Sequence, residues 1–193
     1  MEEPYFFKLD ADVVGFLKQC SQSIGHYHAD KFDQNIWSMI QECNITSPIE
    51  QYLYMALHLC FEQNFYPEID SHVINGQTFF NGYSITPQYE LDKYRCDFMV
   101  SYIPLLTSFE ECSRHQGQRQ VIVECDSQTW HERSEDERRY EKARDRAFIK
   151  AGFHTFHFTG KEIMADPFLV ASEIVSFVTD HDKTMIYEAC HAD

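Results

Sequence analysis

Two carboxylates end an apolar run in the second half of the chain. The segment VIVECDSQTWHER, residues 121–133, begins like a buried β-strand and continues with Glu124 and Asp126. Side chains two residues apart lie on the same face of a strand, so these carboxylates are expected to be neighbours. Because two like charges in a partly dry site cost free energy, the pattern indicates that a positive partner offsets their repulsion.

A third acidic residue, Asp97, lies in the alternating segment YRCDFMVSYI, residues 94–103. This alternation predicts a strand with Asp97 in its middle, on the same face as Arg95. If the two strands are neighbours, Asp97, Glu124 and Asp126 converge at one edge of the sheet. Clustered oxygen ligands suit Mg²⁺ or Mn²⁺, which assist phosphodiester cleavage by neutralising phosphate oxygens and acidifying a bound water. The alternative for Asp97 is a structural ion pair with Arg95.

The segments around the carboxylates predict a mixed α/β domain. Capping boxes, Asn-Gly turns, alternation and helical spacing supply the signals. The expected elements are a helix from Ser47, strands between Phe65 and Ile103 with turns at Asn75-Gly76 and Asn81-Gly82, a strand over Gln120–Asp126, a helix from Ser134 to Gly152, a strand over Phe153–Phe158 and a helix from Pro167. The fold class is therefore α/β, with a central mixed β-sheet flanked by helices.

The domain organisation expected from these patterns is simple. A chain of 193 residues is long enough for one domain with a sizeable core. We expect a helical extension over residues 1–45, the α/β domain over 46–181 and a C-terminal tail over 182–193. Residues 11–24 and 32–43 supply the helical patterns of the extension.

The chain is acidic, with 16 Lys and Arg against 31 Asp and Glu and a formal net charge of -15. Proteins that bind nucleic acid tightly and unaided usually have a basic face, so this balance argues against a broad basic surface. Residues 131–150 nevertheless hold seven of the sixteen basic residues. The sequence therefore predicts a locally basic helix on an acidic body.

Cellular location is predicted from three absences. The start, MEEPYFFKLD, lacks the pattern of a signal peptide, no run approaches the ~18 apolar residues of a membrane helix, and the seven cysteines are irregularly spaced without CxxC. We expect a soluble, cytoplasmic protein with free thiols and no membrane partner. Cys20 with His26 and His28 forms a faint pattern for a structural zinc site.

The order of these motifs resembles the PD-(D/E)XK nuclease superfamily. Asp97 followed by Glu124-Cys125-Asp126 looks like the core of its site. The segments SPIEQYL, YRCDFMV, VIVECDSQTWH and DERRYEKARDRAFIKAGFHTFHFTGKEI resemble the branch related to the very short patch repair endonucleases, from Ser47 to Ile163. The resemblance implies a restriction-endonuclease-like α-β-β-β-α-β core. It departs where Asp126 replaces the usual Lys, Ser127 replaces a Gly, and His157 stands where relatives often have Arg.

The resemblance also implies roles for the acidic residues. Asp97 and Glu124 would bind the metal, with the carbonyl of Cys125 as a third ligand. Asp126 would be a second-metal ligand or would orient the first ligands. Because the usual Lys is missing, His131 is the candidate to orient or activate water, since a neutral imidazole can accept a proton near pH 7.

Further residues have both a functional and a structural interpretation. Glu50 would assist catalysis or would simply complete the capping box with Ser47. His131 would activate water or follow Trp130 into a turn, and His154 and His157 are expected on the sheet surface or in the core. Four basic residues would contact phosphates: Arg138, Arg139, Lys142 and Arg144. The alternative is that they form an exposed helix face with ion pairs within the helix.

Three functions are compatible with these patterns. The first is a Mg²⁺- or Mn²⁺-dependent endonuclease that hydrolyses phosphodiester bonds in DNA. The second is an inactive module of the same fold that binds nucleic acid or protein. The third is an unrelated α/β interaction protein, which predicts that Asp97 and Glu124 lie far apart. The sequence does not predict the oligomeric state.

Overall fold

The structure of the protein is a computed structural model. It describes residues 15, 36, 38–63, 69–74, 77–108, 110, 114, 118–126 and 134–191, and for some of these, including 181–191, the backbone alone. The elements follow the order α3 (Pro48–Gln63), β1 (Ile69–Ile74), β2 (Gln77–Pro87), β3 (Glu90–Leu91), β4 (Tyr94–Arg95), β5 (Phe98–Ser108), β6 (Arg119–Asp126), α5 (Glu135–Lys150), β7 (His154–Thr159), α6 (Gly160–Ala165) and α7 (Pro167–His191).

Five strands form one mixed sheet in the order β1-β2-β5-β6-β7, and β3 pairs with β4 in a separate hairpin. Neighbours from β1 to β6 are antiparallel, whereas β7 runs parallel to β6. The parallel pair is joined through α5, because a parallel connection needs a crossover. The prediction of an α/β domain with a central mixed sheet flanked by helices is confirmed.

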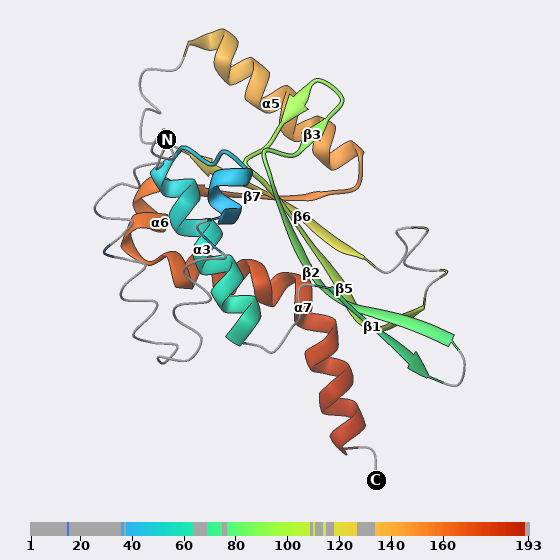
Figure 1. Ribbon diagram of the computed structural model, residues 1–193. Coiled ribbons are helices and arrows are strands. Elements are labelled where there is room, and N and C mark those ends of the chain that lie inside the picture. The colour runs from blue at the N-terminus through green and yellow to red at the C-terminus, as the bar shows by residue number, and fades with distance from the viewer. Residues whose placement is uncertain are drawn as a thin grey trace, which may run out of the picture.

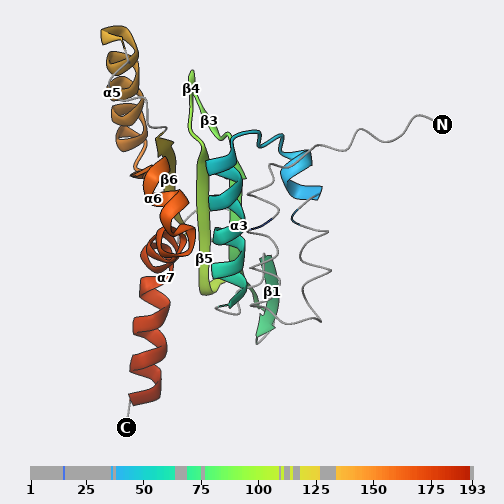
Figure 2. The same ribbon diagram turned by 90° about the vertical axis from the view of Figure 1, so that its left-hand side faces the viewer.

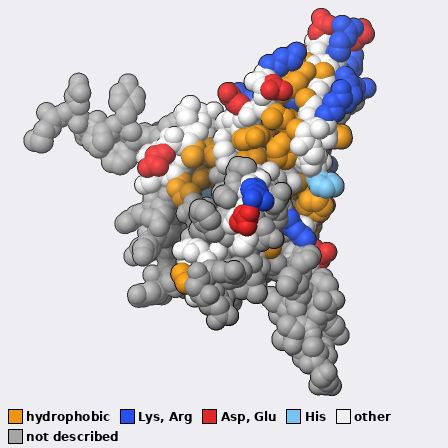
Figure 3. Space-filling view, turned by 90° about the vertical axis from the view of Figure 1, so that its right-hand side faces the viewer, with side chains coloured by type: hydrophobic (Ala, Val, Ile, Leu, Met, Phe, Trp, Pro, Cys, Tyr) orange, Lys and Arg blue, Asp and Glu red, His pale blue; other side chains and the backbone are white. Residues whose placement is uncertain are grey.

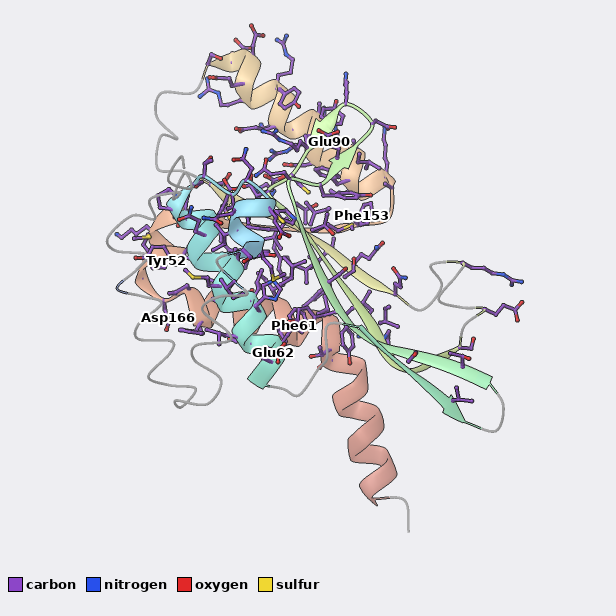
Figure 4. All side chains as sticks on the ribbon, in the orientation of Figure 1. Tyr52, Phe61, Glu62, Glu90, Phe153 and Asp166 are labelled. Carbon is purple, nitrogen blue, oxygen red and sulfur yellow. The ribbon has the colours of Figure 1, made fainter. Side chains whose placement is uncertain are left out.

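Helices cover both faces of the sheet (Figure 1). On one face, α3, α6 and α7 bury the main core with alternate strand residues, among them Val100, Val121 and Val123. On the other face, Ile122 of β6 forms a smaller cluster with Phe148 of α5. Phe153, which follows α5, packs against this cluster (Figure 4). Alternation in β6 thus directs odd-numbered residues to the main core and even-numbered residues to α5.

The long axis of the molecule has α5 at one end and the C-terminal half of α7 at the other (Figure 2). α5 has the predicted capping box of Ser134 and Glu137 at its start. Gly152, with a φ of 91°, follows its end as predicted. The backbone of α7 continues as a helix to His191, through most of the range expected to be a tail.

The predicted N-terminal extension is described only at residues 15, 36 and 38–45. Ile36, Ile40 and Ile45 are buried in the main core, so this part of the range belongs to the folded body. Within the described part of the chain, no helix has the length and apolar composition to cross a bilayer.

One predicted turn is wrong. Asn81-Gly82 lies inside β2, where the pairing with β5 shifts register between Phe80 and Gly82. Gly82 has a φ of 139°, which a residue with a Cβ rarely adopts, so the glycine forms a β-bulge instead of a turn. Ile74 pairs with Gln77 in the β1–β2 hairpin, but residues 75 and 76 lie outside the described residues.

The position of Asp97 also differs from the prediction. The alternating segment is interrupted at Cys96 and Asp97, between β4 and β5, so Asp97 precedes a strand instead of occupying its middle. Cys96 is buried with Ile122 near α5, whereas Phe98 is buried in the main core, although continuous alternation would place both side chains on one face. Because Asp97 lies outside a strand, strand alternation does not decide the direction of its side chain.

Candidate functional site

The ends of β5 and β6 bring Asp97 next to Glu124-Cys125-Asp126. Phe98 pairs with Val123 in antiparallel register, which places Asp97 beside the residues that follow Val123. The backbone N–H of Cys125 donates a 2.7 Å hydrogen bond to Oδ2 of Asp97. The interaction-protein hypothesis expected Asp97 and Glu124 far apart, whereas Asp97 contacts the residue that follows Glu124. Arg95 is exposed, and within the described residues no ion pair joins it to Asp97.

Glu124 is buried against a cation from α5. Its side chain is 3% exposed and that of Arg144 is 14% exposed, and Nη1 of Arg144 lies 3.1 Å from Oε2 of Glu124. Glu124 shares the α5-facing side of β6 with Ile122, so strand alternation explains its direction. The prediction that Arg144 contacts phosphates is corrected, because its guanidinium points into the protein and contacts Glu124.

Asp126 contacts a histidine, His157, that was expected on the sheet surface or in the core. Nδ1 of His157, on the neighbouring β7, lies 3.3 Å from Oδ2 of Asp126. Nε2 of the same ring lies 3.7 Å from Oδ1 of Asp145 on α5. The hydrogen bond with Asp126 raises the pKa of His157, opposed by partial burial. The imidazole therefore links two carboxylates from different elements.

Glu50 reaches the same region from the first turn of α3. Nε2 of Gln88 donates a 2.7 Å hydrogen bond to Oε2 of Glu50, and the backbone N–H of Gln88 donates to the carbonyl of Asp97. Burial and the nearby Asp97 raise the pKa of Glu50 to about 7, while hydrogen bonds from Gln88 and Ser47 oppose the rise. Glu50 thus has contacts with the site beyond helix capping.

The pKa values of Glu124 and Asp97 are both raised, so ionising both carboxyl groups at once is unfavourable. Burial, with Asp97, Asp126 and Asp145 nearby, raises the pKa of Glu124 to about 8 although Arg144 opposes the rise. Burial also raises the pKa of Asp97, against the hydrogen bond from Cys125. Such a cluster is stabilised by added positive charge.

The oxygen-rich donor set fits a hard divalent cation. Oε1 of Glu124 is buried without a hydrogen-bond partner, so one oxygen of the most buried carboxylate remains for another ligand. Carboxylate and carbonyl oxygens are the ligands that Mg²⁺ and Mn²⁺ prefer. In the described part of the chain no three His, Cys, Asp or Glu side chains already surround a common point at ligand distance. Metal binding would therefore require side-chain movements, including those of the pair formed by Glu124 and Arg144.

Glu50→Gln is expected to stabilise the protein at pH 8.5 and to leave its stability unchanged at pH 5. The folded-state pKa of Glu50 is about 7, above its ordinary value of 4.5. A raised carboxyl pKa means that stability is lost as the pH rises from about 4.5 through 7. The neutral amide avoids this loss, and we expect a gain of about 1 kcal/mol, reduced from the full shift because Glu50 is partly exposed.

Urea unfolding of both proteins at the two pH values measures this effect. Equal stability at pH 8.5 would indicate that Glu50 serves only to cap α3. A loss at pH 8.5 would mean that its ionised form stabilises the fold.

The remaining predicted residues divide between the surface of α5 and undescribed segments. Arg138, Arg139 and Lys142 are exposed on α5, and Arg139 forms ion pairs of 3.6 and 3.5 Å with Glu135 and Asp136. Pairs this exposed contribute little stability. His131 lies outside the described residues, as do the members of the faint zinc pattern, Cys20, His26 and His28.

Four contributors to the site were not predicted from the sequence, namely Gln88, Arg144 as an inward residue, Asp145 and His157. A signal existed for Arg144, because it lies four residues from both Tyr140 and Phe148 on the apolar side of the predicted helix. No sequence signal pointed to His157, because its pairing with Glu124 in the parallel register of β6 and β7 appears only in the structure.

Comparisons with protein-family models, with curated proteins and with solved structures give no match for this chain. The class of the protein rests on its fold, which is α/β with a mixed five-stranded sheet. The description of the site rests on the contacts between its side chains. Its chemistry is a buried carboxylate cluster with one arginine and one histidine.

Proposed function

We propose that the protein is a metal-dependent nuclease with a restriction-endonuclease-like core that hydrolyses phosphodiester bonds in DNA. The observation that carries the proposal is the 2.7 Å hydrogen bond from the Cys125 N–H to Asp97, which holds Asp97 beside Glu124 and Asp126 at the end of β6. The resemblance of the motif order to PD-(D/E)XK nucleases supports the same chemistry.

Asp97, Glu124 and Asp126, with the carbonyl of Cys125, would hold Mg²⁺ or Mn²⁺. A bound divalent ion supplies charge neutralisation for the phosphate and a more acidic water. The unpartnered Oε1 of Glu124 leaves one carboxylate oxygen for the ion, whereas the raised pKa of Glu124, about 8, means that a proton competes with the ion at lower pH. Because ligand carboxylates must be ionised, affinity for the ion is expected to increase with pH up to about 8.

The protein's own residues would orient the reactants. With a pKa of about 7, Glu50 can accept a proton near neutral pH, in the role that the missing Lys leaves open. His131, the candidate expected from the sequence, would be the alternative for this role. Arg138, Arg139 and Lys142 would contact phosphates from α5, and Arg144 would hold Glu124 in place through their 3.1 Å contact.

A cleavage assay on the purified protein tests the proposal. End-labelled DNA and RNA, each single- and double-stranded, are incubated with Mg²⁺, with Mn²⁺ and with EDTA at pH 8. Cleavage of DNA that requires the metal is the expected result. Cleavage that persists in EDTA, or RNA cleavage alone, would contradict the proposed activity.

The contact between Arg144 and Glu124 supports a second candidate, an inactive module of the same fold. Arg144 already provides positive charge at the most buried carboxylate, so a metal is not needed for stability. Calorimetric titration with Mn²⁺ at pH 8 distinguishes the two functions. Absence of both heat and cleavage would favour the inactive module, which binds nucleic acid or protein without hydrolysis.

A further inference from the structure

Beyond its first turn, which exposes Glu135, Asp136 and Glu137, the exposed face of α5 is basic although the chain is acidic. Burial sorts the charges of this helix after its first turn, because Glu141 and Asp145 are half-buried. The exposed residues between positions 138 and 150 are Arg138, Arg139, Tyr140, Lys142, Arg146, Ile149 and Lys150. This set, called the α5 face below, contains five cations and no carboxylate. Figure 3 shows Lys and Arg side chains along this end of the molecule, with Asp and Glu side chains at its tip.

The cations of the α5 face are regularly spaced. Arg138, Lys142, Arg146 and Lys150 follow one another at intervals of four residues, which places their Cα atoms about 6 Å apart along the helix. Within the described residues, none of these four side chains takes part in an ion pair. They form a narrow basic stripe that can accompany a single phosphate backbone.

An exposed aromatic ring accompanies the stripe. Tyr140 is 49% exposed, and its ring centroid lies 5.4 Å from that of Tyr94 on β4. Nζ of Lys93 lies 5.2 Å from the centroid of the Tyr94 ring. An aromatic surface beside cations binds unpaired bases, because stacking requires a base face that a duplex covers.

The aromatic pair lies close to the carboxylates. Tyr140 precedes Arg144 by four residues, about 6 Å along the helix, and Arg144 contacts Glu124. Tyr94 precedes Asp97 by three residues in the chain. A strand held by Tyr140 therefore passes near the candidate site.

We propose that the α5 face binds single-stranded DNA, with Tyr140 stacking on an unpaired base and the basic stripe contacting the phosphates. This inference rests on the proposed nuclease function and specifies its substrate as single-stranded or locally unpaired DNA. The acidic body of the protein disfavours the second strand of a duplex, since net charge of -15 repels additional phosphates.

Fluorescence anisotropy in EDTA tests the inference, because binding is then measured without cleavage. A labelled single strand of about 12 nucleotides is compared with its duplex. The single strand is expected to bind at least tenfold more tightly. Tyr140→Leu should weaken its binding about tenfold, whereas Tyr140→Phe, which keeps the aromatic face, should retain it.

Salt titrations examine the phosphate contacts. Lys142→Gln and Arg146→Gln should each reduce the slope of log K against log salt by about 0.7. Lys161→Gln, an exposed lysine on α6, is the matched control and should leave the slope unchanged.

The outcomes separate this inference from the proposed nuclease. Equal or tighter duplex binding, an unaffected Tyr140→Leu variant that folds normally, or no binding to either DNA would overturn the inference, whether or not the protein cleaves. Single-strand binding that Tyr140→Leu weakens, combined with no metal-dependent cleavage, would support the α5 face and reject the nuclease.

Discussion

Asp97→Asn is expected to reduce the rate of DNA cleavage by at least about a thousandfold. Charge stabilisation by a bound metal contributes several kcal/mol to the transition state, and about 4 kcal/mol corresponds to a thousandfold in rate. Asn keeps the shape of Asp and can still accept the hydrogen bond from the Cys125 N–H. The folded structure should therefore persist while the anionic ligand is lost.

Asp92→Asn is the matched control for this variant. Asp92 is exposed at the β3–β4 hairpin, with a φ of 55° that Asn tolerates. Single-turnover rates with Mg²⁺ and thermal unfolding of both variants are compared with the wild type. Full activity in a folded Asp97→Asn protein would remove Asp97 from the catalytic site and with it the main support for the nuclease.

Arg144→Met is expected to lower the free energy of unfolding by about 3 kcal/mol at pH 9 and by about 1 kcal/mol at pH 6. Removing one partner of a buried ion pair leaves the other charge without compensation. Glu124 is 3% exposed, and its pKa is about 8, so it is mainly ionised at pH 9 and mainly protonated at pH 6. The cost of losing the guanidinium therefore increases as the pH rises through about 8.

A double-mutant cycle measures the coupling of this pair. Arg144→Met combined with Glu124→Leu should recover most of the lost stability, because no unpaired buried charge remains. Arg146→Met is the control, since Arg146 is exposed on the same helix and should change stability by no more than about 0.5 kcal/mol. Urea unfolding at both pH values provides the data. A cost for Arg144→Met that is independent of pH would show that packing of the side chain, and not its charge, is what stabilises Glu124.

Sequence signals that involve only residues close together in the chain predicted helix and strand positions correctly. The capping box of Ser134 and Glu137 and the stop at Gly152 are formed as expected. These signals are reliable because a cap depends on backbone groups within one turn of the helix. The β6 strand likewise follows its apolar run.

Signals that depend on distant partners were less reliable. Asn81-Gly82 has the composition of a tight turn, but pairing of β2 with the long strand β5 converts it to a bulge. Alternation from Tyr94 to Ile103 suggested one continuous strand, but it breaks at Cys96 and Asp97 because Cys96 is buried near α5. Tertiary packing overrode the local pattern in both places.

The amino-acid sequence by itself determined the helices α3, α5 and α7, the strands β6 and β7, the mixed α/β class and the carboxylates that end β6, because periodicity and capping act over a few residues. Only the tertiary structure decided which groups meet. Asp97 reaches the Cys125 N–H through strand pairing, Arg144 turns inward to Glu124, and His157 meets Asp126 across a parallel pair. These contacts join residues that lie 20 to 31 positions apart in the chain. They are formed by the pairing of β6 with β5 and β7 and by the packing of α5 on the sheet, and no local pattern predicts them.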